Sequence, residues 1–109
     1  MAFNEALAER IRQRLARRKN IDEKKMFGCI CFFINGNALV GVWKDRLIAR
    51  LGPDEGVMAL REPHVQAFDI TGRPMRNWVA VEPEGVEDDD QLKAWIERAL
   101  KFVRTLPKK

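Results

Sequence analysis

The side chains that could carry out chemistry are few in this 109-residue sequence, which has no serine, no tyrosine, one histidine, two cysteines and two threonines. A serine-based catalytic triad is therefore excluded, as is any site that needs two histidines. Apart from carboxylates and lysines, the nucleophiles are Cys29, Cys31, Thr71 and Thr105, and His64 is the one side chain that ordinarily titrates near neutral pH. This inventory favours a binding protein over an enzyme.

The two cysteines are separated by one residue in an apolar segment that is typical of a β-strand. They then lie on the same face of the strand, where an unstrained disulfide does not readily form. A C-x-C pair with one distant histidine also supplies too few ligands for a structural zinc site. We therefore expect buried thiols in a reducing cytoplasm, a surface-exposed His64, and neither metal nor cofactor, because no phosphate-binding or dinucleotide-binding glycine motif occurs.

A basic segment at residues 24–28 (KKMFG) is the first candidate binding site. The lysine ammonium groups could contact a phosphate or an acidic partner, and a glycine would let the backbone approach that ligand closely. The alternative is that the two lysines merely lead into a buried strand. The candidate residues here are Lys24, Lys25 and Gly28.

Residues 71–76 (TGRPMR) form a second basic segment with the composition of a turn. Two arginine side chains at a turn suit phosphate or carboxylate groups, because the guanidinium fork forms paired hydrogen bonds. The alternative is a turn shaped by its threonine, glycine and proline, with the arginines solvated. We take this turn as the best binding candidate, through Thr71, Gly72, Arg73, Met75 and Arg76.

Arg10, Arg14 and Arg17 also lie along one flank of the first expected helix, and Arg18 and Lys19 extend the charge. A basic stripe could bind nucleic acid. The alternative is that acids at the start of the helix and bases at its end complement the helix dipole. The net charge of +4, from 20 basic and 16 acidic residues, does not decide between these interpretations.

The apolar periodicity predicts one α+β domain over residues 1–109, with the order α-β-β-β-α-β-β-α and an antiparallel sheet. The first helix is expected at about 3–18, with Asn4 as its cap. The second is expected between Pro53 and Pro63, and the last at an Asp88–Gln91 capping box. Strands are expected at 25–34, 38–43, 46–51, 67–70 and 77–82. No apolar run approaches the roughly 20 residues that a membrane span requires, so no membrane is expected.

The first expected strand is apolar on both faces. One face carries Ile30, Phe32 and Ile34, and the other carries Phe27, Cys29, Cys31 and Phe33. Helices on one side alone would leave apolar surface bare, and such surface usually marks a partner. Either the helices divide between the faces, or the free face meets another chain.

Taken in order, several segments resemble the N-terminal domain of the TfoX/Sxy family, regulators associated with natural competence in bacteria. The resemblance covers nearly the whole chain. It is carried by residues 24–28 (KKMFG), 35–37 (NGN), 40–42 (VGV), 68–75 (FDITGRPM), 78–79 (WV) and 106–107 (LP). The KMFG and GRPM segments together are fairly specific, and a departure occurs at Cys29, where the family often has a second glycine.

The resemblance implies a two-layer α/β fold like that of the secretion chaperones, and it implies no reaction, cofactor or catalytic residue. The competence regulators carry a second helical domain, whereas these 109 residues correspond to the first, so we expect a stand-alone domain. We expect a non-enzymatic regulatory or adaptor domain acting through protein contacts, with a protein partner or a second copy of the chain, in competence-related transcriptional regulation. Direct nucleic-acid binding through the basic turn and the first-helix arginines is the alternative. No small-molecule substrate is identified.

Overall fold

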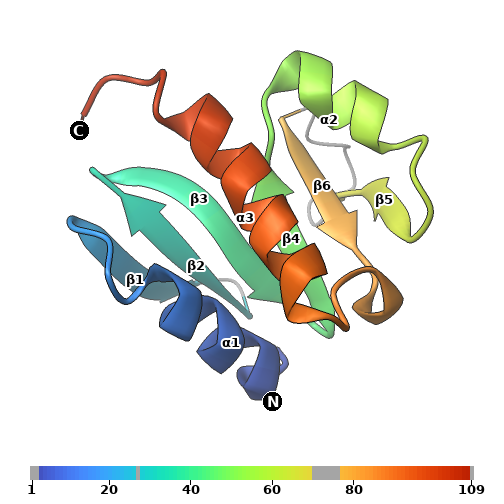
Figure 1. The fold of residues 1–109 in the computed structure, drawn as a ribbon, viewed down its shortest axis with the longest axis horizontal. Coiled ribbons are helices and arrows are strands. Elements are labelled where there is room, and N and C mark those ends of the chain that lie inside the picture. Colours follow the sequence, from blue (N-terminus) through green and yellow to red (C-terminus); the bar gives the residue numbers. More distant parts are fainter. Residues whose placement is uncertain (1–2, 27, 70–76, 109) are drawn as a thin grey trace.

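One face of a six-stranded antiparallel sheet is covered by helices, and the order of its strands is β1-β2-β3-β4-β6-β5 (Figure 1). This computed structural model describes residues 3–26, 28–69 and 77–108. The elements are α1 (Glu5–Leu15), β1 (Ile21–Met26), β2 (Cys29–Ile34), β3 (Asn37–Trp43), β4 (Arg46–Arg50), α2 (Pro53–Ala59), β5 (Val65–Ala67), β6 (Trp78–Val81), the 3-10 helix η1 (Pro83–Gly85) and α3 (Asp89–Val103). The expected α+β class and antiparallel sheet are confirmed.

The prediction of a single strand at 25–34 was wrong. This range spans the end of β1, a turn and all of β2, which pair as a hairpin, so the sheet has one strand more than expected. Gly28 has a φ of 76° in the turn between the two strands, a conformation that glycine adopts without steric cost. The sequence of β1, IDEKKM, lacks apolar alternation because the strand lies at the edge of the sheet and exposes four charged side chains. The remaining strands fall within a few residues of their expected positions.

The predicted helix starts are confirmed by their caps. The Asn4 Oδ1 atom accepts a hydrogen bond from the Leu7 N–H at 3.1 Å, and the Asp88 N–H donates to Gln91 Oε1 at 3.0 Å within a capping box. The first helix ends at Leu15, three residues before its predicted end. None of the described helices has both the length and the apolar character that a membrane span needs.

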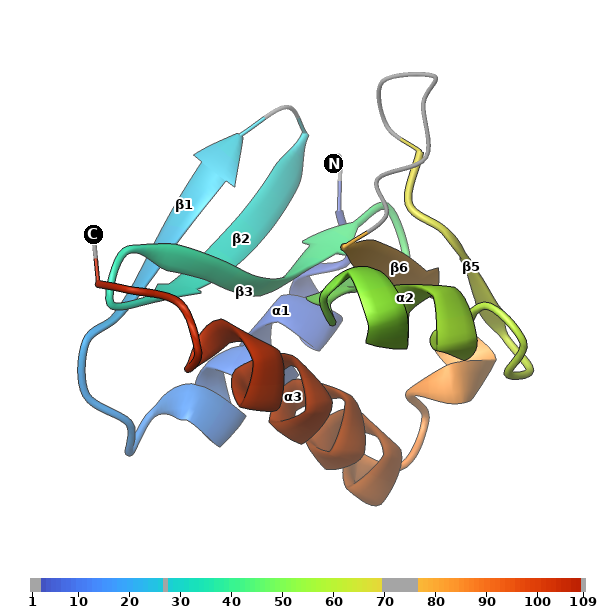
Figure 2. The same cartoon turned by 90° about the horizontal axis from the view of Figure 1, so that it is seen from above.

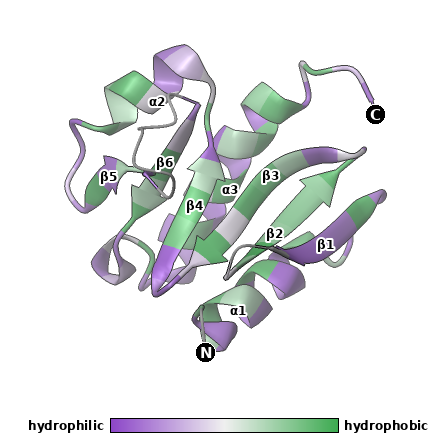
Figure 3. Cartoon of the chain, turned by 180° about the vertical axis from the view of Figure 1, so that it is seen from behind, coloured by the Kyte–Doolittle hydropathy of each residue, from purple (hydrophilic) through white to green (hydrophobic). Residues whose placement is uncertain are grey.

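All of the described helices lie on the same side of the sheet, as Figure 2 shows from above and Figure 3 shows from behind. The main core lies between these helices and the sheet. Its fully buried side chains include Ile11, Ile30, Phe32, Leu39, Val42, Leu47, Leu92 and Leu100. The helices therefore do not divide between the two faces, and the sheet's other face has a different covering.

Candidate functional site

The face of the sheet that points away from the helices, called the outer face below, is lined by a row of small and apolar residues. Cys31 pairs with Gly41, Gly41 with Ile48, and Ile48 with Ala80, across four neighbouring strands. A Cβ atom at Gly41 would lie 2.4 Å from the Ile30 carbonyl oxygen and 3.2 Å from both Cys31 Sγ and Ile48 Cγ1. Glycine at this position therefore lets the neighbouring side chains close over the strand.

An aromatic cluster covers part of this row. The ring of Phe68 lies 5.4 Å from that of Trp43 and 6.0 Å from that of Trp78, in edge and tilted arrangements that favour aromatic pairs. Phe68 is buried, whereas the two tryptophans are only partly buried, as is Phe33, which packs against the same cluster. The outer-face cluster is defined here as Cys31, Phe33, Trp43, Ile48, Phe68, Trp78 and Ala80.

Basic side chains lie against the partly exposed rings of this cluster. The Lys24 Nζ atom lies 5.8 Å from the centre of the Phe33 ring. On the Trp43 ring, Lys44 Nζ lies at 4.9 Å and the Arg46 guanidinium carbon at 5.8 Å. Cations over aromatic faces are attracted by the ring quadrupole, so they are held beside apolar surface. The outer face thus combines apolar contact area with positive charge, a combination that suits a partner carrying both apolar and acidic groups.

The structure separates two of the candidate residues that adjoin in sequence. Lys24 pairs with Cys31 and belongs to the outer face, whereas Lys25 points to the helix side, where its Nζ atom lies 5.9 Å from the Phe3 ring. Gly28 lies in the turn of the β1–β2 hairpin, where its φ of 76° suits glycine. Lys24 is therefore the member of this segment that joins the outer face. The candidates Thr71, Gly72, Arg73, Met75 and Arg76 lie outside the described residues.

The thiols lie on the outer face as buried groups. Burial raises the pKa of Cys31 to about 11, with a further contribution from the neighbouring Cys29, and burial also raises the pKa of Cys29. A raised pKa keeps a thiol neutral and unreactive near pH 7. His64 is exposed, as the sequence predicted, with its carbonyl oxygen accepting from the Glu82 N–H at 2.8 Å. Within the described residues, no group of three or more His, Cys, Asp or Glu side chains could hold a metal ion.

Three arginines of the basic stripe, Arg10, Arg14 and Arg18, are engaged by acidic side chains of the same chain. Arg10 lies 3.2 Å from Asp89, Arg14 3.8 Å from the same carboxylate, and Arg18 2.7 Å from Glu97. The pairs of Arg10 and Arg14 tie α1 to α3, and the pair of Arg18 ties the segment after α1 to α3. A phosphate ligand would have to compete with these carboxylates for the guanidinium groups, which favours the structural interpretation of the stripe.

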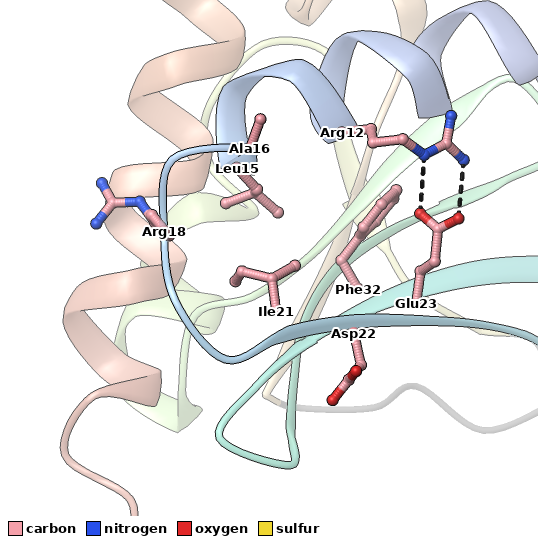
Figure 4. Close-up of a pocket in the computed structure, with 8 residues that line it drawn as sticks. All are labelled: Arg12, Leu15, Ala16, Arg18, Ile21, Asp22, Glu23 and Phe32. Atoms are coloured by element: carbon pink, nitrogen blue, oxygen red, sulfur yellow. Dashed lines mark hydrogen bonds and ion pairs between the residues drawn. The ribbon is translucent and has the colours of Figure 1, made fainter.

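A cleft of about 300 Å³ lies between α1 and β1 (Figure 4). Leu15, Ile21 and Phe32 form its apolar part, and Arg12 closes one end by donating to both oxygens of Glu23 at 2.9 and 3.1 Å. Figure 4 shows Asp22 pointing away from this cleft on the other side of β1. The Arg12–Glu23 pair satisfies both charges internally, so the cleft presents no unpaired charge of either residue to a ligand.

A separate apolar patch lies on α2, where Val57 is 52%, Met58 58% and the adjoining Leu60 43% exposed. These three are the most exposed large apolar side chains that the structure describes. They lie on the helix side of the sheet. The patch serves below as a reference surface.

The sequence matches the family model of the TfoX N-terminal domain over residues 13–103. The chain belongs to this family. Neither the curated proteins nor the solved structures include a match. The resemblance seen in residues 24–28 and 68–75 is therefore confirmed, and membership of the TfoX N-terminal domain family suggests a regulatory or adaptor role.

The tryptophans of the outer-face cluster, Trp43 and Trp78, are not among the candidate residues taken from the sequence. Trp43 ends β3 and Trp78 begins β6, and both positions leave a ring partly exposed. A tryptophan at a strand end followed by a lysine was the available signal for Trp43. The sequence offered no comparable signal for the pairing of Phe68 with both tryptophans.

Proposed function

We propose that this TfoX N-terminal domain is a non-enzymatic regulatory or adaptor domain that acts by binding a protein through its outer face, in competence-related transcriptional regulation. The observation that carries the proposal is the outer-face cluster itself. The rings of Phe33, Trp43 and Trp78 are partly exposed on the side of the sheet without helices, and three basic side chains flank this cluster. Aromatic residues and arginine are enriched at protein interfaces.

The partner surface that fits this face is apolar with acidic residues at its margin. The rings of Phe33, Trp43 and Trp78 would bury against apolar side chains, while Lys24, Lys44 and Arg46 would face carboxylates. Because these cations already stack on rings, they lose less freedom on binding than freely rotating side chains would. The strands beneath hold the rings in a rigid arrangement.

A variant that reverses the two charges on Trp43, Lys44→Glu with Arg46→Glu, tests the proposal. The immobilised wild-type domain and this variant are compared for the proteins they retain, with quantitative mass spectrometry. The matched control is Lys93→Glu with Lys101→Glu, an equal charge change at exposed positions on α3. A protein retained by wild type and control, but lost from the outer-face variant, is the expected result. Retention of no protein above a blank resin, or equal retention by all three, contradicts the proposal.

Direct nucleic-acid binding is the alternative function, and it predicts a different outcome. Phosphate contacts are strongest at low salt, so gel retardation of DNA or RNA at ~50 mM salt would reveal them. Retardation that weakens steeply with salt, and that charge reversal of Arg10 and Arg14 weakens further, would favour this alternative. The pairing of these arginines with Asp89 leads us to expect no retardation.

A further inference from the structure

The edge strand β1 carries a charge order that is complementary to itself. Along its middle run two acidic and then two basic residues, Asp22, Glu23, Lys24 and Lys25, and all four are exposed. Two copies of this segment placed antiparallel can bring Asp22 of each copy opposite Lys24 of the other, whereas an in-register parallel arrangement brings like charges together. Charges on an edge strand normally discourage pairing, because an arbitrary partner strand does not neutralise them. A second copy of β1 is an exception to this rule, because its Asp22 and Lys24 can neutralise the Lys24 and Asp22 of the first copy.

We propose that β1 is a homodimerisation edge, at which β1 of one copy pairs antiparallel with β1 of a second copy. Among the described residues, β1 pairs only with β2, so its other edge is open over six residues. The opposite edge of the sheet is β5, with three residues. The longer open edge thus coincides with the self-complementary charge order. The proposal does not depend on the proposed function of the outer face.

The faces of the strand limit which registers are possible. Side chains directly opposite one another in an antiparallel pair must lie on the same face, so a symmetric pair has its two-fold axis at a residue of β1. Lys24 lies on the outer face, as does Asp22, while Glu23 and Lys25 lie on the helix side. An axis at Glu23 places Asp22 opposite Lys24 of the second copy, and Lys24 opposite its Asp22.

The axis at Glu23 is favoured over the neighbouring axis at Lys24. With the axis at Glu23, the like charges that meet are two glutamates, and each is already held by both nitrogens of Arg12 at 2.9 and 3.1 Å. With the axis at Lys24, the Lys24 side chains of the two copies would face each other. Within the described residues, Lys24 has no acidic side chain as a partner. The first register therefore forms two outer-face ion pairs and leaves no uncompensated like-charge contact.

The expected dimer has one continuous sheet with both outer faces on the same side. This follows because the two-fold axis of an antiparallel strand pair is perpendicular to the sheet. The ion pairs between Asp22 and Lys24 are exposed to solvent, so the dimer is expected to weaken as salt rises. The helices of both copies would then cover the opposite side.

A charge-swap experiment tests this pairing. Asp22→Lys and Lys24→Asp each convert the two outer-face pairs into like-charge contacts, so each variant alone is expected to dimerise at least tenfold more weakly than wild type. A 1:1 mixture of the two variants restores opposite charges and is expected to form a heterodimer of near wild-type affinity. The measurement is sedimentation equilibrium at low salt, with circular dichroism confirming that each variant is folded.

Matched controls change the outer-face charge by the same amount away from β1. Asp45→Lys corresponds to the first variant and Arg46→Asp to the second, and both should dimerise as wild type does. The proposal is overturned by a wild-type chain that stays monomeric, by a dimer unaffected in the two β1 variants, or by a mixture that stays monomeric. Equal weakening in the controls would also overturn it, because the effect would then reflect net charge alone. Each of these results leaves the partner-binding test of the outer face unaffected.

Discussion

Substitution of Gly41 by alanine should reveal how tightly the outer face is packed. The added Cβ would lie 2.4 Å from the Ile30 carbonyl oxygen, whereas ordinary carbon–oxygen contacts between strands are about 3.3–3.6 Å. The oxygen belongs to the backbone of the adjacent strand β2, so relief requires β2 and β3 to separate by nearly 1 Å. Such a movement lengthens the hydrogen bonds of the central ladder and disturbs Cys31 and Ile48 above it.

The magnitude follows from two opposing effects. Overpacking costs about 1–3 kcal/mol, and a contact with rigid backbone belongs at the upper end of that range. Weakened ladder hydrogen bonds add about 1 kcal/mol, while replacing glycine returns about 0.5–1 kcal/mol by restricting the unfolded chain. We therefore expect Gly41→Ala to lower the free energy of unfolding by about 3 kcal/mol and the midpoint temperature by roughly 10 °C or more.

Urea denaturation followed by circular dichroism measures this loss, and a second variant identifies its cause. Cys31→Ala removes the Sγ atom at 3.2 Å but leaves the Ile30 oxygen in place. Adding Cys31→Ala should therefore not restore the stability of the Gly41→Ala protein. A Gly41→Ala protein within about 0.5 kcal/mol of wild type would refute the close approach of β2 and β3 at this position.

Three further predictions concern stability. Arg98→Ala should lower the free energy of unfolding by about 1–2 kcal/mol in thermal or urea denaturation, because Arg98 donates to both oxygens of Glu62 at 2.8 and 3.1 Å and stacks 4.4 Å from the Trp95 ring. Arg98→Lys cannot form the paired hydrogen bonds, so it should recover only part of this stability. Full recovery in Arg98→Lys would contradict the bidentate contact. Asp88→Ala should lower the free energy of unfolding by about 1 kcal/mol through loss of the capping box, and an unchanged helix content and stability would contradict that role. The folded-state pKa of Cys31, about 11 against an ordinary 9.0, means that its neutral thiol stabilises the fold fully below pH 9 and that this contribution is lost as pH rises toward 11. Unfolding measured from pH 8 to 11 should therefore show a smaller decline in Cys31→Ala than in wild type, and equal declines would contradict burial of the thiol.

Much of the fold was predictable because its elements carry strong local signals. The Asn4 and Asp88 caps and the apolar spacing of α3 indicate helices directly, and Asn35 and Gly36 adopt the positive φ values of 52° and 82° that a tight hairpin needs. Strand β1 was missed because an exposed edge strand needs no alternation of apolar residues. Its turn is marked by one glycine, Gly28, which was considered in the sequence as a candidate for ligand contact.

The candidate site was less predictable, because it depends on contacts between distant segments. The sequence shows that β2 is apolar on both faces, and Lys24 is among the candidates taken from it. It does not show that Phe68 lies against Trp43 and Trp78, since that arrangement depends on the strand order β3-β4-β6-β5. The first-helix arginines could be recognised as dipole partners, but their carboxylate partners Asp89 and Glu97 lie 75 or more residues away along the chain.

Site-specific photocrosslinking in cells tests most directly whether the outer face contacts a protein. A photoreactive phenylalanine analogue at Phe33 samples the outer face, and the same analogue at Met58 samples the exposed patch on α2. The account predicts a covalent adduct with a protein from position 33, and its loss when Lys44 and Arg46 are changed to glutamate. Adducts from position 58 alone, or none from position 33 in cells that express the domain stably, would contradict it.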